Sequence, residues 1–477
     1  MGCAFRLLVP AVVACSLPLR GAGAAELDHL APHLDGGDLI LLWVVPFVGI
    51  LLSIALFPLF APSIWHHHYG KISAGWAALF LVPFALRFGI DLAVYEALHT
   101  TLLEYIPFII LLFALFTVTG GLRVRTSYQG TPAFNTGVLL LGTALASWMG
   151  TTGAAMLLIR PLLRANMWRR YKVHTVVFFI FLVANIGGSL TPLGDPPLFL
   201  GFLKGVGFFW PTQALFLPMA TVSATLLVLY YLMDRIMIRR EPGGPPEPPA
   251  DEPKLRIEGK INLLLLAGIV LAVLMSGVWD PEIDFEIYHV EVGLQNLARD
   301  ALLLLIAAAS WRLTPQVTRK ANEFSWFPII EVAKLFAGIF ITIIPAIAIL
   351  RAGSAGALAP VVDLVNEGGE PVNVMYFWAT GILSSFLDNA PTYLVFFNTA
   401  GGNAELLTGP LSTTLLAISA GAVFMGANTY IGNAPNFMVR AIAEERGVAM
   451  PSFLGYMVWS SLILLPIFAA ISWLFFT

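Results

Sequence analysis

The stretch GGSLTPLGDPPLFL, Gly187 to Leu200, lies between two apolar segments but contains three glycines, three prolines and one aspartate. Glycine permits tight turns and proline interrupts a helix, so the stretch predicts a break within an apolar span. Irregular backbone is tolerated in a bilayer only where protein or a water-filled cavity satisfies its polar groups. Because the carboxylate of Asp195 lies at this break, the stretch indicates a polar site inside a membrane protein.

The composition agrees with this interpretation. Of 477 residues, 58% are hydrophobic and 12% are charged, which is about half the charged fraction of a soluble protein. Two apolar segments, 133–164 and 371–400, are interrupted by small or polar residues, and we interpret them as re-entrant hairpins. The remaining apolar runs predict an all-α integral membrane protein with ten crossings, at 39–60, 73–91, 101–120, 173–190, 211–233, 261–279, 296–312, 329–350, 411–428 and 452–476.

The N-terminus is typical of a secretory signal peptide. Arg6 precedes a short apolar stretch, 7–17, and small residues follow it at 21–25. We expect residues 1–25 to be removed, and an uncleaved first helix is the alternative. The only two cysteines, Cys3 and Cys15, belong to this segment, so a cleaved chain would have no disulfide or thiol chemistry.

The distribution of charge predicts the orientation. If the mature N-terminus is outside, the outside loops contain only Lys204, Arg299 and Arg351 as basic residues, and they include the acidic segment 280–291. Because lysine and arginine concentrate in cytoplasmic loops, this orientation is favoured. We therefore expect a multi-pass protein of the inner (plasma) membrane. The net charge of −3 gives no indication of a nucleic-acid partner.

A proline-rich stretch, EPGGPPEPPADEPK at 241–254, divides the chain into two halves of similar length. Such a segment cannot bury apolar surface, so we interpret residues 239–260 as a cytoplasmic linker. The two halves that it joins are predicted transmembrane units, 26–238 and 261–477.

The two halves are related by an internal repeat at one constant, ungapped offset. SWMGTTGAA at 147–155 aligns with SFLDNAPTY at 385–393, and NIGGSLTPLGDPPLFL at 185–200 aligns with VFMGANTYIGNAPNFM at 423–438. Each half contains five predicted crossings, an odd number, so the repeats must have inverted topology. Each repeat is expected to contain one re-entrant hairpin and one broken helix.

Inverted repeats with broken helices are how many secondary transporters build a site at mid-membrane. Four irregular points are expected to converge here, at 150–153, 187–197, 388–392 and 426–436. Their polar side chains are the candidate ion- or substrate-binding residues: Thr151, Thr152, Asn185, Thr191, Asp195, Asp388, Asn389, Thr392, Asn428, Thr429, Asn433 and Asn436.

Asp195 and Asp388 are the carboxylates of this set. Removal from water favours the protonated form of a carboxyl group, and neighbouring carboxylates can bind a small hard cation. We therefore interpret both as candidate Na⁺ ligands that also carry protons. The alternative is that each aspartate caps the N-terminus of a half-helix. The chain has no G-x-x-x-x-G-K phosphate loop, and neither an enzymatic activity nor a bound cofactor is expected.

Two segments, ANIGGSLTPLGD at 184–195 and SSFLDNAPT at 384–392, resemble the ion-transporter superfamily. Within it, the chain is similar to the NhaD-type sodium/proton antiporters and to the putative citrate-transport branch beside them. The resemblance implies a homodimer in which scaffold domains hold two moving transport domains around a cation site. By motif, Asp195 and Asp388–Asn389 match the acidic and amide positions of the antiporters. The first hairpin carries Gly150–Thr151, where those antiporters tend to have an aspartate–asparagine pair.

The acidic candidates favour a sodium/proton antiporter, with Na⁺ and H⁺ as the transported ions and the lipid bilayer as the surroundings. A proton- or sodium-coupled transporter of citrate or a related carboxylate is the alternative. Transport of other substrates, including oxyanions, and a channel or a non-transporting receptor are further possibilities that the residues leave open.

Overall fold

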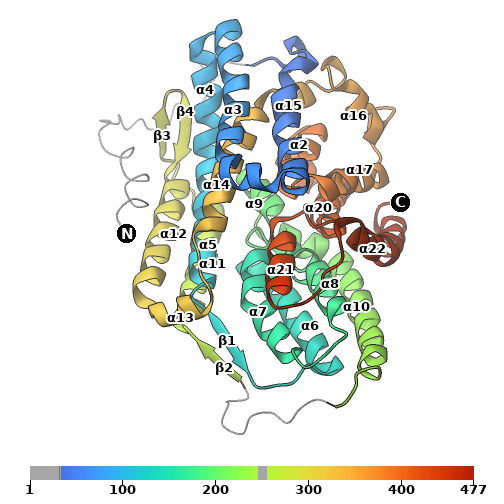
Figure 1. The fold of residues 1–477 in the computed structure, drawn as a ribbon. Coiled ribbons are helices and arrows are strands. Elements are labelled where there is room, and N and C mark those ends of the chain that lie inside the picture. The colour runs from blue at the N-terminus through green and yellow to red at the C-terminus, as the bar shows by residue number, and fades with distance from the viewer. Residues whose placement is uncertain (1–31, 33, 245–254) are drawn as a thin grey trace.

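The fold is seen in a computed structural model, which describes residues 32, 34–244 and 255–477 (Figure 1). The predicted signal peptide, 1–25, and part of the predicted linker, 245–254, lie outside the described residues. Helices dominate the described chain, and the only strands there are short. The prediction of an all-α membrane protein is confirmed.

Eight helices pack against one another and are named the frame helices: α2 (Val45–Phe60), α3 (Pro62–Phe88), α4 (Ile90–Thr100), α5 (Ile106–Thr119), α11 (Ile261–Val278), α12 (Leu294–Leu313), α14 (Phe327–Thr342) and α15 (Ile344–Arg351). α3 packs against α2 and α14, and α5 packs against α11 and α12. A π-helical turn, η3 (Thr101–Tyr105), joins α4 to α5 in one continuous segment.

The second group, named the site helices, contains both predicted hairpins and both predicted broken helices. The hairpins are α6 (Pro132–Met149) with α7 (Thr151–Ala165), and α17 (Asn373–Phe386) with α18 (Asn389–Thr399). The first broken helix is α8 (Val173–Leu182), η4 (Ile186–Leu190) and α9 (Pro196–Leu203). The second is α20 (Ser412–Met425), η6 (Gly426–Asn428) and α21 (Ala434–Glu445). Two long helices, α10 (Trp210–Ile238) and α22 (Phe453–Phe475), pack beside them.

The remaining elements are short. Three antiparallel strand pairs are β1 (Arg123–Thr126) with β2 (Leu255–Glu258), β3 (Asp284–Ile287) with β4 (Val290–Gly293), and β5 (Asn366–Glu367) with β6 (Glu370–Pro371). The short helices are η1 (Gly36–Asp38), η2 (Leu41–Val44), α13 (Gln316–Ala321), η5 (Gly353–Ala355), α16 (Ala359–Val365) and α19 (Ala404–Thr408).

Among the described residues, seven segments are long and apolar enough to cross a membrane, and α14 with α15, bent by 41°, makes an eighth. These eight correspond to predicted spans. The other two predicted spans are also helices in the structure: α20 with η6 is apolar but short, and α12 contains Arg299 and Asp300 within its length. The chain is therefore a multi-pass membrane protein.

The starts of two spans differ from those predicted by 11 residues each, 62 against 73 and 90 against 101. The second span was expected to begin at residue 73, but α3 begins at Pro62, since proline is well tolerated at the first position of a helix. The helix that contains the third span begins at Ile90 rather than 101. The break before it is at Gly89, whose φ of +97° lies in the region that favours glycine.

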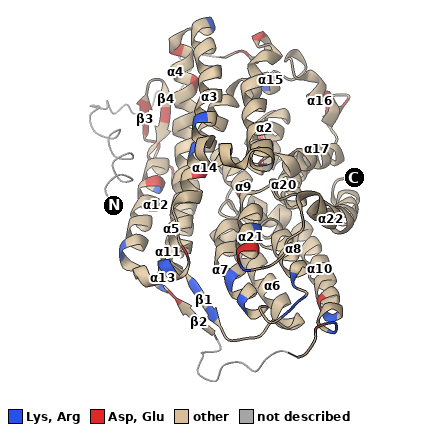
Figure 2. Ribbon diagram, viewed as in Figure 1, with Lys and Arg blue, Asp and Glu red and all other residues tan. Residues whose placement is uncertain are grey.

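The charged residues are unevenly distributed between the two ends of the molecule (Figure 2). Lysine and arginine gather around β1, α13 and the lower end of α7, whereas acidic residues mark β3, β4 and α16 at the other end. This asymmetry is the one from which the orientation is predicted, and by that rule we expect the β1–β2 end to face the cytoplasm.

The orientation can be tested by labelling single cysteines in a chain in which Cys3 and Cys15 are replaced by serine. Arg170 and Glu286 both have exposed side chains. We expect an impermeant thiol reagent added to intact cells to label Glu286→Cys and not Arg170→Cys. Labelling of Arg170→Cys from outside would contradict the orientation.

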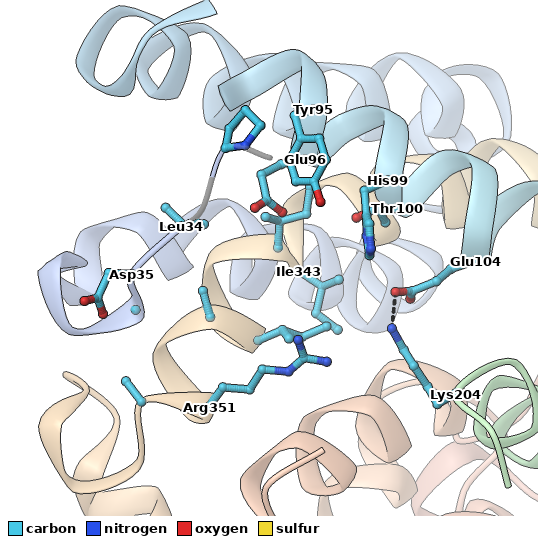
Figure 3. Close-up of a pocket in the computed structure, with 16 residues that line it drawn as sticks. Leu34, Asp35, Tyr95, Glu96, His99, Thr100, Glu104, Lys204, Ile343 and Arg351 are labelled. Atoms are coloured by element: carbon cyan, nitrogen blue, oxygen red, sulfur yellow. Dashed lines mark hydrogen bonds and ion pairs between the residues drawn. The ribbon is translucent and has the colours of Figure 1, made fainter. Parts of the chain in front are cut away.

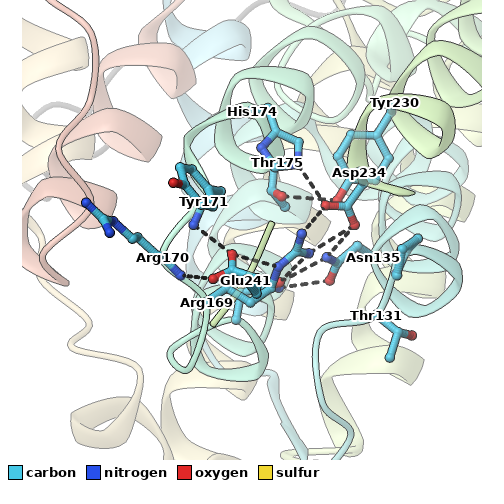
Figure 4. A network of polar contacts seen from close by, with 12 residues as sticks. Thr131, Asn135, Arg169, Arg170, Tyr171, His174, Thr175, Tyr230, Asp234 and Glu241 are labelled. Atoms are coloured by element: carbon cyan, nitrogen blue, oxygen red, sulfur yellow. Dashed lines mark hydrogen bonds and ion pairs between the residues drawn. The ribbon is translucent and has the colours of Figure 1, made fainter. Parts of the chain in front are cut away.

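A buried polar network ties the start of α8 to α10 and α6 (Figure 4). The fully buried carboxylate of Asp234 accepts hydrogen bonds from Arg169 at 3.0 Å and from Asn135 at 3.2 Å, and lies 2.7 Å from His174 Nε2. The Glu241 carboxylate accepts two backbone N–H bonds from the same loop. The partners offset the cost of burying this charge, and all of them lie within the network, so we interpret it as structural rather than as part of a transport site.

Candidate functional site

The first broken helix is interrupted between α8 and α9. α9 begins at Pro196, and Asp195 before it has an extended backbone, with φ −140° and ψ 143°. The side chain of Asp195 does not cap α9, so its carboxylate is available for contacts with other segments. The break is tightly folded: a Cβ on Gly194 would lie 2.0 Å from the carbonyl oxygen of Gly188.

The second broken helix has the same construction. α21 begins at Ala434, and Asn433 before it is extended, with φ −152° and ψ 139°, and makes no side-chain cap. A Cβ on Gly432 would lie 2.6 Å from the carbonyl oxygen of Gly426. In the alignment of the two repeats, Asn433, Gly432 and Gly426 are the counterparts of the aspartate and the two glycines of the first break.

Each break is hydrogen-bonded to the hairpin of its own repeat. Thr191 donates to the carbonyl oxygen of Ser147, and Thr429 donates to that of Ser385. The Ser147 hydroxyl donates to the Gly187 carbonyl at 2.5 Å, and the Ser385 hydroxyl donates to the Met425 carbonyl at 3.0 Å. These contacts recur at aligned positions, as an internal repeat predicts. In Figure 1, α6 and α7 lie in the lower half of the molecule and α17 in the upper half.

Asp195 lies where these irregular segments meet, and it is 2% exposed. Its carboxylate accepts hydrogen bonds from Thr151 Oγ1 at 3.0 Å, from Asn433 Nδ2 at 3.1 Å and from Asn389 Nδ2. The donors come from the first hairpin, the second break and the second hairpin. Within the described chain, no lysine, arginine or histidine forms an ion pair with this carboxylate.

A chain of amides surrounds this carboxylate. Asn433 also donates to the Ala184 carbonyl at 3.2 Å and to Asn185 Oδ1 at 3.3 Å, and Asn185 donates to Asn436 Oδ1 at 2.7 Å. Asn436 in turn donates to the carbonyl oxygens of Gly426 and Thr429 at 2.8 and 2.9 Å. The amides therefore join the two breaks across the repeat and hold Asp195 between them.

The other predicted residues have different environments. Asp388 is partly exposed, and its Oδ1 accepts the backbone N–H of Ala390 at 3.1 Å, so it caps α18. Thr392 donates to the carbonyl of Asp388 at 3.0 Å. Asn428 donates to the Ser385 hydroxyl at 2.9 Å. Thr152 is partly exposed near the first hairpin tip.

Ser147 and Ser385 were absent from the predicted set, although they hold both breaks in place. The alignment of 147–155 with 385–393 begins on these two serines, so the repeat itself was the signal that could have identified them. The residue type alone does not mark them, because a serine on an apolar helix commonly bonds to the backbone of its own helix.

The site has the ligands that a small hard cation prefers. The carboxylate of Asp195 supplies negative charge, and Oδ1 of Asn389 is a buried oxygen without a hydrogen-bond partner. Carboxylate and amide oxygens are typical ligands of hard cations. Among the described residues, no cluster of three His, Cys, Asp or Glu side chains could hold a metal ion. The arrangement therefore fits a cation held by one carboxylate and neutral oxygens.

A cavity of about 420 Å³ lies apart from this site, near the predicted outer face (Figure 3). Its lining includes His99 and Glu104 of the continuous α4–α5 segment, Lys204 after α9, and Arg351 of α15. None of the twelve candidate residues lines it.

Comparison with known proteins identifies the family. A family model described as "Putative citrate transport" matches residues 36–476. The chain belongs to this family. It is also similar to a "46 kDa membrane protein" of Mycobacterium leprae, with 24% identity over 65% of this chain and 69% of the relative. Uncharacterised transporters of Mycobacterium bovis and Mycobacterium tuberculosis each show 23% identity over 67% of this chain and 71% of the relative. This family member is therefore a membrane transporter.

The contacts of Asn433 make it the most informative neighbour of Asp195. Asn433→Ala removes one donor from the carboxylate and leaves the other two. Since a hydrogen bond to a charged group contributes about 1.5–3 kcal/mol, we expect the apparent affinity for the transported ion to fall about tenfold or more. Ion-dependent transport in proteoliposomes measures this affinity. An unchanged affinity would show that Asn433 does not support the ion site.

Proposed function

We propose that this transporter exchanges sodium ions for protons and that Asp195 carries both. The supporting observation is a buried carboxylate whose hydrogen-bond donors are all neutral. Such a carboxylate is costly to keep charged in isolation, so it favours a bound proton or a bound cation. Because one group cannot hold both at once, binding of Na⁺ requires release of H⁺, which is the basis of exchange.

Asp388 has a second role in this proposal. It immediately precedes Asn389, the residue that donates to Asp195, and it fixes the first turn of α18. The residue is partly exposed, and its carboxylate is a candidate ligand for an ion on its way to or from Asp195. The Asp388 charge and the Asn389 amide thus move together with the second hairpin.

The alternative is a proton- or sodium-coupled transporter of citrate or a related carboxylate, which the description of the family favours. An anionic substrate is normally recognised by basic groups. The four irregular segments, which the structure describes in full, contain no lysine or arginine. For this reason we rank antiport first.

Transport in proteoliposomes distinguishes the two. A Na⁺ or Li⁺ gradient is imposed across vesicles that contain an internal pH dye, with and without citrate. Antiport predicts proton movement driven by Na⁺ alone and unaffected by citrate. Proton movement that occurs only with citrate would support the carboxylate transporter and contradict our proposal.

We further propose that the transporter is a homodimer in the inner (plasma) membrane, as the resemblance to the ion-transporter superfamily implies. Chemical cross-linking in membranes measures the oligomeric state directly. Exclusive recovery of monomers under conditions that cross-link a known dimer would contradict this.

A further inference from the structure

The site helices are joined to the frame helices by a small set of polar side-chain contacts at the two ends of the molecule. At the predicted outer end these are Lys204 with Glu104 and Arg351 with Asn398. At the predicted cytoplasmic end Glu323 contacts both Arg160 and Arg446. We name the first set the outer contacts and the second set the inner contacts.

The outer contacts border the 420 Å³ cavity (Figure 3). Glu104 belongs to the π-helical turn of the frame, a feature frequently found at functional sites. One of its oxygens pairs with Lys204, and the other is buried without a partner. The side chains of Lys204 and Glu104 are only 16% and 7% exposed. Beside them, Arg351 Nε donates to Asn398 Oδ1 at 2.8 Å.

The inner contacts depend on one residue, Glu323, in the loop between α13 and the frame helix α14. Glu323 lies 3.0 Å from Arg160 of α7 and 2.8 Å from Arg446, which follows α21. The adjacent Asn322 donates to the carbonyl oxygens of Gly120 and Leu122, so this loop is fixed to the end of α5. Because the Glu323 side chain is 45% exposed, each of its ion pairs is weaker than the largely buried pair of Lys204 with Glu104.

The two sets have equivalent origins in the repeat. Lys204 and Arg446 are the C-cap residues of α9 and α21, the second halves of the two broken helices. Arg160 and Asn398 occupy the same position in the two hairpins when the repeats are aligned. At each end, therefore, one broken helix and one hairpin contact the frame.

We propose that the outer and inner contacts act as gates that decide from which face the Asp195 site can be reached. This proposal rests on the proposed transport through Asp195. α9 spans eight residues, about 12 Å of rigid helix, with Asp195 before it and Lys204 after it. A shift of Asp195 relative to the frame therefore carries Lys204 away from Glu104. Both sets are formed in this structure, and opening toward one face requires loss of the set at that face.

The gates can be tested by measuring access to the site. All variants are built on one parent protein, in which Cys3 and Cys15 are replaced by serine. The parent also carries Thr152→Cys as the labelling site, next to Thr151 at the first hairpin tip. An impermeant thiol reagent is applied to right-side-out and inside-out vesicles without an ion gradient. Two variants remove one gate each, Glu104→Gln and Glu323→Gln. The control, Glu444→Gln, removes a pair with Arg440 that lies within α21 and does not join a site helix to a frame helix.

We expect Glu104→Gln to raise the labelling rate from outside about tenfold, since it removes a largely buried charged contact. Glu323→Gln should raise the rate from inside by about fivefold or less, because its pairs are exposed. Glu444→Gln should leave both rates unchanged. The double variant Glu104→Lys with Lys204→Glu should return the outside rate to that of the parent, which a damaged fold would not do.

The proposal is overturned if Glu104→Gln and Glu323→Gln label at the parent rates from both faces, or if each opens the wrong face. The experiment measures access of the thiol reagent to the site and not sodium/proton exchange. The gate proposal and the antiport proposal can therefore be contradicted independently of each other. Sodium/proton exchange that requires Asp195, with labelling unaffected by Glu104→Gln, would overturn the gates alone. Face-specific labelling in a protein that moves no protons with Na⁺ would support the gates and overturn the antiport.

Discussion

Asp195→Asn is expected to abolish proton movement driven by a sodium gradient. The amide keeps the size of the side chain and can still accept hydrogen bonds from Thr151 and Asn433, but it can neither bind a proton nor neutralise Na⁺. The variant should fold, because an amide costs less to bury than a charge. The measurement is the fluorescence of an internal pH dye in proteoliposomes after a Na⁺ jump.

Asp388→Asn is the matched comparison. Asparagine is as good an N-cap as aspartate, so α18 should keep its first turn. Because Asp388 caps that helix and Asn389 is the neighbour that reaches Asp195, we expect a smaller reduction of exchange than at Asp195. Normal exchange rates and apparent affinity in both variants would show that neither aspartate is the carrier. Glu104, which is 5% exposed, would then be the next acid to test.

Gly194→Ala is expected to disrupt the first break and to abolish transport. The added Cβ would lie 2.0 Å from the carbonyl oxygen and 2.7 Å from the carbonyl carbon of Gly188. Backbone atoms cannot rotate away, so the backbone segments around Gly188 and Gly194 must move apart, at a cost of at least about 1–3 kcal/mol. Asp195 is the next residue and would move with them. Thermal unfolding in detergent and sodium-driven proton movement measure the two effects.

Gly137→Ala is the control for this substitution. Gly137 lies within α6, and a Cβ there would meet no atom within 4 Å. Alanine is favoured over glycine in a helix by about 0.5–1 kcal/mol, so this variant should be unchanged or slightly more stable. If Gly194→Ala behaved like Gly137→Ala, close packing of the break would not be what positions Asp195.

Local features of the sequence were sufficient for the fold class and for the positions of the irregular segments. Apolar runs about as long as a bilayer crossing identify membrane helices because no polar backbone group can remain unpaired in lipid. Glycine and proline mark the breaks because they act on the backbone of their own residue, and α9 and α21 both begin with proline at one of their first two positions. The constant offset of the internal repeat also identified in advance which positions would be equivalent, including Asp195 and Asn433.

The partners of each candidate were decided by the tertiary structure. Asp388 and Asn389 are adjacent in the sequence, and both were candidates, but only Asn389 contacts Asp195, from 194 positions away. Successive residues at the start of a helix point in directions about 100° apart, so the entry of α18 determines which of them faces the site. The contacts of Lys204 with Glu104 and of Glu323 with two arginines likewise depend on how the site helices lie against the frame. Sequence spacing carries no information on that arrangement, because the packing of whole helices sets it.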